Sequence, residues 1–148
     1  AVARKKPLPL GLIHNRRSLC HVGNLCSALL VALEHPAAAG RTFLVRDGED
    51  LSTTSLVRRM AKALGVRTHL LPVPALLLRM AGQVVGKGPA IDRLTGSLQV
   101  DDGPLRRDLD WRPPFSVDQG LVQTATWFKS RYSEFDHLSE GMKGSDAP

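Results

Sequence analysis

Residues 16–25 read Arg-Arg-Ser-Leu-Cys-His-Val-Gly-Asn-Leu, and they pass from a strand-like run straight into a predicted helix. Apolar residues then recur at helical spacing, at positions 22, 25, 26, 29, 30 and 33. Arg17 is therefore expected at a strand-to-helix corner. Such a corner suits an anion such as a phosphate, because a guanidinium offers a planar fork of donors and free backbone N–H groups lie close by. The stretch predicts an α/β fold with an anion site at this corner.

The rest of the chain alternates strand-like and helix-like patterns. Strands are predicted at residues 8–13, 17–21, 41–45, 67–72 and 98–100. Helices are predicted at residues 23–34, 53–64, 74–85, 104–109 and 117–132. Residues 133–148 are polar and are expected to form a flexible tail, which leaves residues 1–132 as the domain.

Some of the predicted helices carry clear local signals. Ser52 and Gly65 are expected to begin and end the helix at 53–64, and Ser116 with Gln119 has the pattern of a capping box before the last helix. The helix at 74–85 is apolar on most sides. It is therefore expected to be buried or to lie against a partner.

Length and composition indicate an ordinary folded domain. The 148 residues are 43% hydrophobic and 23% charged, which allows a real core without disulfide staples. No apolar run reaches the roughly 20 residues that cross a bilayer, and no signal peptide is evident, so a cytoplasmic location is expected. Cys20 and Cys26 are expected to be reduced core residues, because their spacing fits neither a disulfide framework nor a metal site.

Residue patterns disfavour three other functions. The net charge is +6, but the basic residues are scattered in pairs and only 5% of residues are aromatic, which argues against a nucleic-acid partner. Residues 81–88 nearly spell a phosphate-binding P-loop, yet Gly88 stands where Ser or Thr must ligate magnesium. The histidines never fall at the close spacing of zinc ligands, so no metal is expected.

Arg17 and the residues after it resemble the substrate-side motif of the NAD-dependent nucleotide-sugar epimerases and dehydratases, in the extended short-chain dehydrogenase/reductase family. The motif reads Arg-Asp-Tyr-(apolar)-His-Val-x-Asp-(apolar). The positions that match are Arg17, His21, Val22 and Leu25, and those that differ are Ser18, Leu19 and Asn24. In the family the arginine binds the pyrophosphate of the sugar nucleotide, so the resemblance implies this role for Arg17.

Further segments extend the resemblance. Residues 7–11 resemble the strand that borders the nucleotide base, which implies a main-chain contact around Leu10. Residues 42–52 resemble a strand, an acidic turn and a capped helix that are structural in the family, and the turn's carboxylates are expected to favour the N-terminus of that helix. Residues 100–117 resemble the family's closing segment. A second phosphate-binding arginine often precedes that segment, and Arg93 is the nearest candidate.

The motifs that perform the chemistry of the family are missing from this sequence. NAD binds there at a Gly-x-x-Gly-x-x-Gly turn, and a Tyr-x-x-x-Lys pair moves the proton. Neither pattern is present, and the only tyrosine is Tyr132. The resemblance therefore implies the C-terminal, substrate-binding portion of an enzyme whose Rossmann half, with its NAD(P) cofactor, is absent. No catalytic residue is assigned, and no turnover is expected of the isolated chain.

Two interpretations remain open. In the first, the chain binds a nucleotide sugar such as a UDP-sugar as part of an epimerase or dehydratase, next to the missing Rossmann domain. In the second, it is a stand-alone binding or interaction module without catalysis. Self-association through exposed apolar surface, to which the helix at 74–85 contributes, is also expected.

Overall fold

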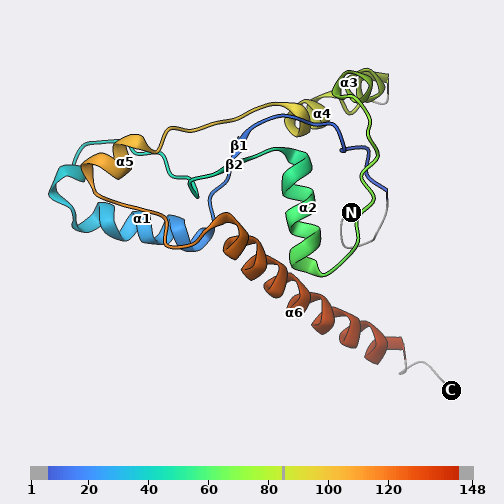
Figure 1. Ribbon diagram of the computed structural model, residues 1–148. Helices are drawn as coiled ribbons and strands as arrows, with labels where there is room; N and C mark the ends of the chain where they lie inside the picture. Colours follow the sequence, from blue (N-terminus) through green and yellow to red (C-terminus); the bar gives the residue numbers. More distant parts are fainter. Residues whose placement is uncertain (1–6, 85, 144–148) are drawn as a thin grey trace.

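The computed structural model describes residues 7–84 and 86–143. Its elements follow the chain in the order β1 (Arg17–Ser18), α1 (Val22–Glu34), η2 (Pro36–Ala38), β2 (Asp50–Leu51), α2 (Thr53–Leu64), α3 (Ala75–Val84), α4 (Gly88–Thr95), α5 (Gly103–Asp108) and α6 (Val117–Lys143). Figure 1 shows α2 near the centre, α1 with α5 at one end, α3 with α4 at the other, and α6 leading away from the body. The molecule is thus mixed α/β, with helices dominant.

A two-stranded sheet holds the middle of the molecule. β1 and β2 are antiparallel, with Arg17 opposite Leu51 and Ser18 opposite Asp50. Arg17 also forms a parallel bridge with Leu98, and the Ser18 N–H donates to the Leu98 carbonyl at 2.9 Å. Three segments that are far apart in the sequence therefore meet at β1.

The prediction of strands alternating with helices is wrong in the number and length of the strands. Residues 41–45 form no strand, and residues 8–13 and 67–72 make only isolated bridges. The pairing of these segments is short, and side chains satisfy backbone groups beside it. Residues 8–11 pair with residues 69–71 through three backbone hydrogen bonds, and the Thr54 hydroxyl binds backbone groups of residues 10 and 13, so this segment is held both by a neighbouring extended segment and by the first turn of α2.

The helices with predicted caps begin and end close to where the sequence predicts. Ser52 caps α2 by accepting a hydrogen bond from the Ser55 N–H at 3.0 Å, and Gly65 ends the helix in the left-handed conformation with φ 69°. The predicted capping box is present, since the Ser116 N–H donates to the Gln119 side chain at 2.8 Å and the Gln119 N–H donates to the Ser116 hydroxyl at 3.3 Å. Both helices begin where the sequence predicts.

Two helices differ from the prediction. α6 continues past Tyr132 to Lys143, so it takes in much of the segment predicted as a tail. Residues 144–148 lie outside the described residues. α4 is not predicted at all, because its 8 residues begin with Gly-Pro and make only about two turns.

Two apolar clusters form the core. The first lies between α1 and α5 and has at its centre Ala28, Leu105, Leu109 and Trp111. The second joins β2 to the start of α6 through Leu51, Val117 and Leu121. Phe43 and Val45 pack on the first cluster, so the extended segment 41–45 contributes apolar surface to the core without forming a strand.

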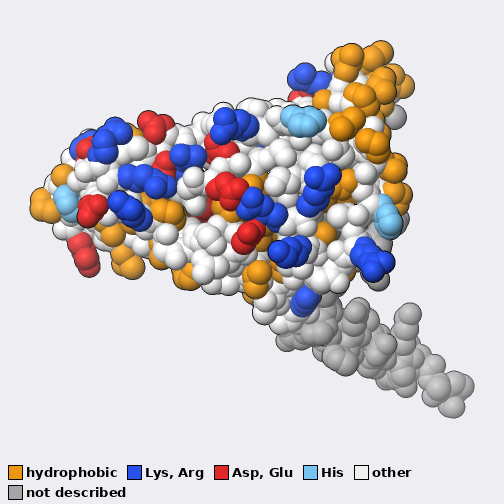
Figure 2. Space-filling view, in the orientation of Figure 1, with side chains coloured by type: hydrophobic (Ala, Val, Ile, Leu, Met, Phe, Trp, Pro, Cys, Tyr) orange, Lys and Arg blue, Asp and Glu red, His pale blue; other side chains and the backbone are white. Residues whose placement is uncertain are grey.

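Several residues expected in the core lie at the surface instead. Cys20 and Cys26 are free and exposed. Cys26 points away from the core because it is two residues from both Asn24 and Ala28, which face inward. The expected burial of the helix at 74–85 is not found within the described residues, and Figure 2 shows apolar side chains gathered over α3. The exposed ones on this helix are Leu76, Leu77, Met80 and Val84.

We expect Asn24 to be the polar residue on which the position of α1 depends. Its buried side chain donates to Asp47 Oδ1 at 2.7 Å and to the Phe115 carbonyl at 2.8 Å, and it accepts from the Phe115 N–H at 2.9 Å. Asn24→Ala leaves these buried groups without their partner. The free energy of unfolding, measured by urea denaturation followed by circular dichroism, should fall by at least about 2 kcal/mol.

Gln83→Ala provides the matched control, because Gln83 is an exposed amide on α3. Its effect should stay within about 0.5 kcal/mol. Equal losses in the two variants would contradict the special role of Asn24.

Candidate functional site

At the strand-to-helix corner, the Asp47 carboxylate of the chain itself lies where a bound anion is expected. His21 is the N-cap of α1, and its N–H donates to the two Asp47 carboxylate oxygens at 2.8 and 2.9 Å. The His21 ring caps the helix as well, since Nδ1 accepts a hydrogen bond from the Gly23 N–H at 3.2 Å. The expectation that this corner offers these N–H groups to a ligand is therefore wrong, because Asp47 holds the place of the anion.

The acidic turn that contains Asp47 is structural, as the sequence predicts, but it serves other elements than α2 alone. Asp47 binds the start of α1. The Glu49 carboxylate accepts hydrogen bonds from both terminal nitrogens of Arg59, at 2.8 and 2.5 Å. Asp50 accepts a hydrogen bond from the Ser18 hydroxyl at 2.7 Å. The turn thus ties β1, α1 and α2 together through hydrogen bonds rather than through the dipole of a single helix.

The glycines at this corner and at α3 provide no cradle for a dinucleotide. A Cβ on Gly23 would lie 2.8 Å from the Phe115 ring, so the missing side chain makes room for Phe115 and not for a ligand. A Cβ on Gly82 would clash with Ile91, where α3 packs on α4. Glycine serves internal packing at both positions, and the residues described there do not fit the pyrophosphate of NAD.

The Arg17 side chain turns toward α4 rather than toward the corner. Its Nη1 donates to the carbonyls of Arg93 and Gly96, the latter at 3.5 Å, at the C-terminal end of α4. A cationic donor suits this end, because the last carbonyls of a helix lack partners within the helix. The structure thus brings two of the predicted site residues, Arg17 and Arg93, together at one junction.

The positive charge at this junction is not neutralised by the residues that the structure describes. Arg16 and Arg93 are exposed and Arg17 is half-buried, and none of them forms an ion pair with a described carboxylate. Asp92, next to Arg93 in sequence, pairs instead with Arg79 at 2.8 Å. Arg16, Arg17 and Arg93 lie on segments that meet at the Arg93 and Gly96 carbonyls, and these three residues are here named the arginine patch.

Leu10, the third predicted site residue, connects to the arginine patch through a polar cluster at the start of α2. The Leu10 carbonyl accepts a hydrogen bond from the Thr54 hydroxyl at 2.5 Å. The buried Asn15 amide donates to the neighbouring Thr53 hydroxyl at 3.0 Å and to the Gly96 carbonyl at 2.8 Å. That carbonyl also accepts from the arginine of β1. The main chain at Leu10 is therefore linked to the patch through this cluster.

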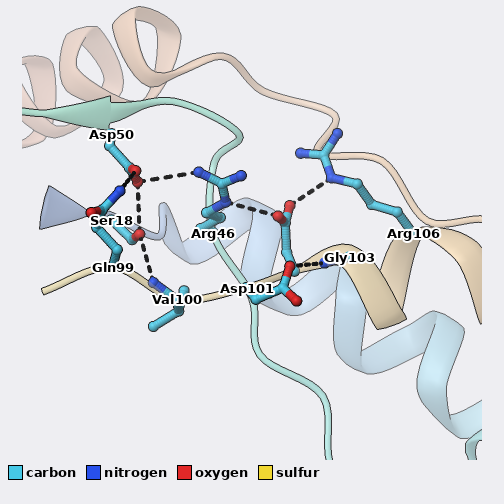
Figure 3. A network of polar contacts seen from close by, with 9 residues as sticks. Ser18, Arg46, Asp50, Gln99, Val100, Asp101, Gly103 and Arg106 are labelled. Carbon is cyan, nitrogen blue, oxygen red and sulfur yellow. Dashed lines mark hydrogen bonds and ion pairs between the residues drawn. The ribbon is translucent and has the colours of Figure 1, made fainter. Parts of the chain in front are cut away.

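A network of polar contacts fixes β1 (Figure 3). The Ser18 hydroxyl donates to Asp50 at 2.7 Å and accepts from the Val100 N–H at 3.0 Å. Gln99 and Arg46 donate to the same Asp50 carboxylate, at 2.6 and 3.2 Å. β1 is thereby held to β2 and to the segment before α5, which fixes one side of the arginine patch.

Asp102 is the second centre of this network. It is 2% exposed, and it accepts from Arg46 Nε at 2.7 Å and Arg106 Nε at 2.6 Å. Burial alone would raise the pKa of this carboxyl, but the hydrogen bonds and charges of the two guanidinium groups hold the pKa of Asp102 below its usual range. The pKa of Asp50 is lowered as well, chiefly by the hydrogen bond from the Ser18 hydroxyl.

The sequence does not single out the buried polar residues that build this part of the molecule. They are Asn15, Asn24, Asp47, Thr53, Thr54 and Asp102. Asn24 carries a signal, because it stands at the second Asp position of the motif that begins at Arg17. The others look like turn, helix-start or surface residues, since their partners are distant in the sequence.

The described residues contain no group of three or more His, Cys, Asp or Glu that could hold a metal ion. In the same part of the chain, no helix is both long and apolar enough to cross a membrane.

The chain is related in sequence to the nucleotide-sugar epimerases, which confirms the resemblance carried by the motif at Arg17. It is 43% identical over 128 residues to the UDP-glucose 4-epimerase of Vibrio cholerae. The matched residues make up 86% of this chain and 39% of that protein, so the chain spans well under half of the length of this relative. No family model and no solved structure matches.

We expect the network around Asp102 to make folding sensitive to acid. Because the folded-state pKa values of Asp102 and Asp50 are lowered, their contribution to stability is present above the unfolded-state pKa of about 3.9 and is lost as the pH falls through the folded-state values. Thermal midpoints followed by circular dichroism should therefore fall steeply below about pH 4.

Asp102→Asn separates this effect from that of the other carboxylates. The variant should be less stable at neutral pH and should lose less of its stability in acid. Asp118→Asn, at an exposed position, should keep the acid response of the wild type. The network is not the source of the response if Asp102→Asn loses as much stability in acid as the wild type.

Proposed function

We propose that this chain is the C-terminal, substrate-binding portion of an NAD-dependent nucleotide-sugar epimerase or dehydratase, and that the arginine patch binds the pyrophosphate of a UDP-sugar. One observation carries the proposal. Arg17, at the phosphate-binding position of the family motif, lies beside Arg93 and Arg16 without a carboxylate partner among the described residues. The similarity to a UDP-glucose 4-epimerase supports the choice of a uridine nucleotide.

Each residue of the proposed site has a distinct task. Within the described residues only Nη1 of Arg17 has hydrogen-bond partners, so Nε and Nη2 remain to donate to phosphate oxygens. The exposed Arg93 side chain reaches the second phosphate. The main chain around Leu10 borders the base. NAD, held by a part of the longer protein outside this chain, supplies the transient oxidation of the sugar, and no residue here is assigned to proton transfer.

The isolated chain is expected to bind weakly and to have no turnover. A charge-assisted hydrogen bond contributes about 1.5 to 3 kcal/mol, whereas millimolar binding already requires about 4 kcal/mol. One or two such contacts on part of a site therefore support millimolar affinity at best.

Ligand-observed NMR with UDP and with uridine tests the arginine patch. Arg93→Ala is the informative variant, because Arg17 binds the Arg93 carbonyl, which the substitution leaves in place. The variant should bind UDP about tenfold more weakly or worse, since one charge-assisted contact is lost. Its signal with uridine should not change, because uridine carries no phosphate.

Arg112→Ala is the matched control, since Arg112 is exposed but lies beyond α5, away from the patch. Equal UDP binding by Arg93→Ala and the wild type would remove Arg93 from the site. Micromolar binding of UDP by the chain alone would contradict the proposal of a partial site. A folded chain that does not respond to UDP at all would favour the interaction module without nucleotide binding.

A further inference from the structure

Asn15 joins the first turn of α2 to the last turn of α4. Its Oδ1 accepts a hydrogen bond from the Thr53 N–H at 2.8 Å, and its Nδ2 donates to the carbonyls of Leu94 and Gly96, at 3.2 and 2.8 Å. Only 7% of the Asn15 surface is exposed. The first N–H groups and the last carbonyls of a helix lack partners within it, so a side chain between these two ends must both accept and donate. An amide does both, whereas a carboxylate only accepts.

The position of α4 depends on contacts of this kind. α4 is 8 residues long and begins without a side-chain hydrogen bond at its cap. So short a helix is not stable by itself, and neighbouring parts of the fold must hold it. One side packs on α3, where Ile91 fills the space beside Gly82, and Figure 1 shows the two helices together at one end of the molecule. The end of α4 is held against α2 and β1 by the side chains of Asn15, Thr53 and Arg17.

Asn15 shares an acceptor with the arginine patch. The Gly96 carbonyl accepts from Asn15 Nδ2 at 2.8 Å and from Arg17 Nη1 at 3.5 Å. Arg93 lies in the last turn of α4, next to Leu94, whose carbonyl is also bound by Asn15. The distance between the Arg93 side chain and β1 is therefore set by how the end of α4 is held.

We propose that Asn15 is a positioning residue of the arginine patch: its amide holds the end of α4 so that Arg93 reaches the same diphosphate as Arg17. Asn15 itself does not touch the ligand. The inference rests on the proposed function, because it takes the patch to be a phosphate site. By linkage, a diphosphate that spans both arginines also favours the docked position of α4.

Asn15→Ala tests this role in binding. The variant should bind UDP about tenfold more weakly than the wild type by ligand-observed NMR, as Arg93→Ala does, because one charge-assisted contact is lost. Its signal with uridine should not change, since uridine carries no phosphate. Asn15→Ala combined with Arg93→Ala should bind UDP no more weakly than Arg93→Ala alone, because Asn15 acts through Arg93.

Asn24→Ala is the matched control for lost stability. Asn24 is also a buried amide, but its partners are Asp47 and Phe115, at the start of α1. The folded variant should therefore keep the UDP affinity of the wild type. An equal loss of UDP binding in Asn24→Ala and Asn15→Ala would overturn the inference, because destabilisation alone would then explain both.

Hydrogen exchange of the wild-type chain tests the link between ligand and α4 without a substitution. At a UDP concentration equal to the dissociation constant, exchange of the amides in residues 88–96 should slow about twofold, because occupancy favours the docked helix. Uridine at the same concentration should leave this exchange unchanged. The measurement stays decisive if Asn15→Ala does not fold.

Three further results would overturn the inference and leave the proposed function intact. One is wild-type UDP affinity in Asn15→Ala. Another is a double variant that binds UDP clearly more weakly than Arg93→Ala. The third is bound UDP that leaves the exchange of α4 unchanged. A folded wild type that does not bind UDP would contradict the proposed function and this inference together.

Discussion

The hydrogen bonds of the Asp47 carboxylate to the start of α1 are the interaction on which the rest of the structure depends. Asp47 is 8% exposed, and it accepts from the His21 N–H and from the Asn24 side chain. Asn24 in turn binds both backbone groups of Phe115, just before α6. One buried carboxylate thus joins the β1–α1 corner to the segment that leads into α6. Its desolvation is acceptable only because these donors are already in place.

This internal anion decides where an external one can bind. Since Asp47 takes the N–H group at the corner, a phosphate would meet a carboxylate there rather than free donors. The Arg17 side chain lies on the other side of β1, at the end of α4. The motif residue and the helix N-terminus, which the sequence places together, are therefore used for separate purposes in the fold.

Local signals were the part of the fold that the sequence could predict. Ser52, Gly65 and the capping box at Ser116 act on neighbouring residues, so they define helix ends without knowledge of the rest of the chain. The motif at Arg17 is local in the same sense. The strands, in contrast, depend on distant partners. Residues 8–11 pair only briefly with residues 69–71, and the side chains of Asn15 and Thr54 bind other backbone groups nearby. The contact of Arg17 with the Arg93 carbonyl likewise depends on α4. This helix is not predicted from the sequence, because it is short and begins with Gly-Pro.

The anion site proposed at the arginine patch rests on how the described carboxylates are distributed. Arg46 and Arg106 are paired with Asp102, and Arg59 with Glu49, whereas the arginine patch, like other exposed arginines such as Arg58 and Arg67, forms no ion pair with a described carboxylate. At the patch, the Arg17 side chain donates to carbonyls at the end of α4, whose dipole offsets part of its positive charge. An anion bound there would form hydrogen bonds with guanidinium groups that have no carboxylate partner among the described residues. Because such an anion would bind the folded chain and not the unfolded one, occupancy of the patch would stabilise the fold.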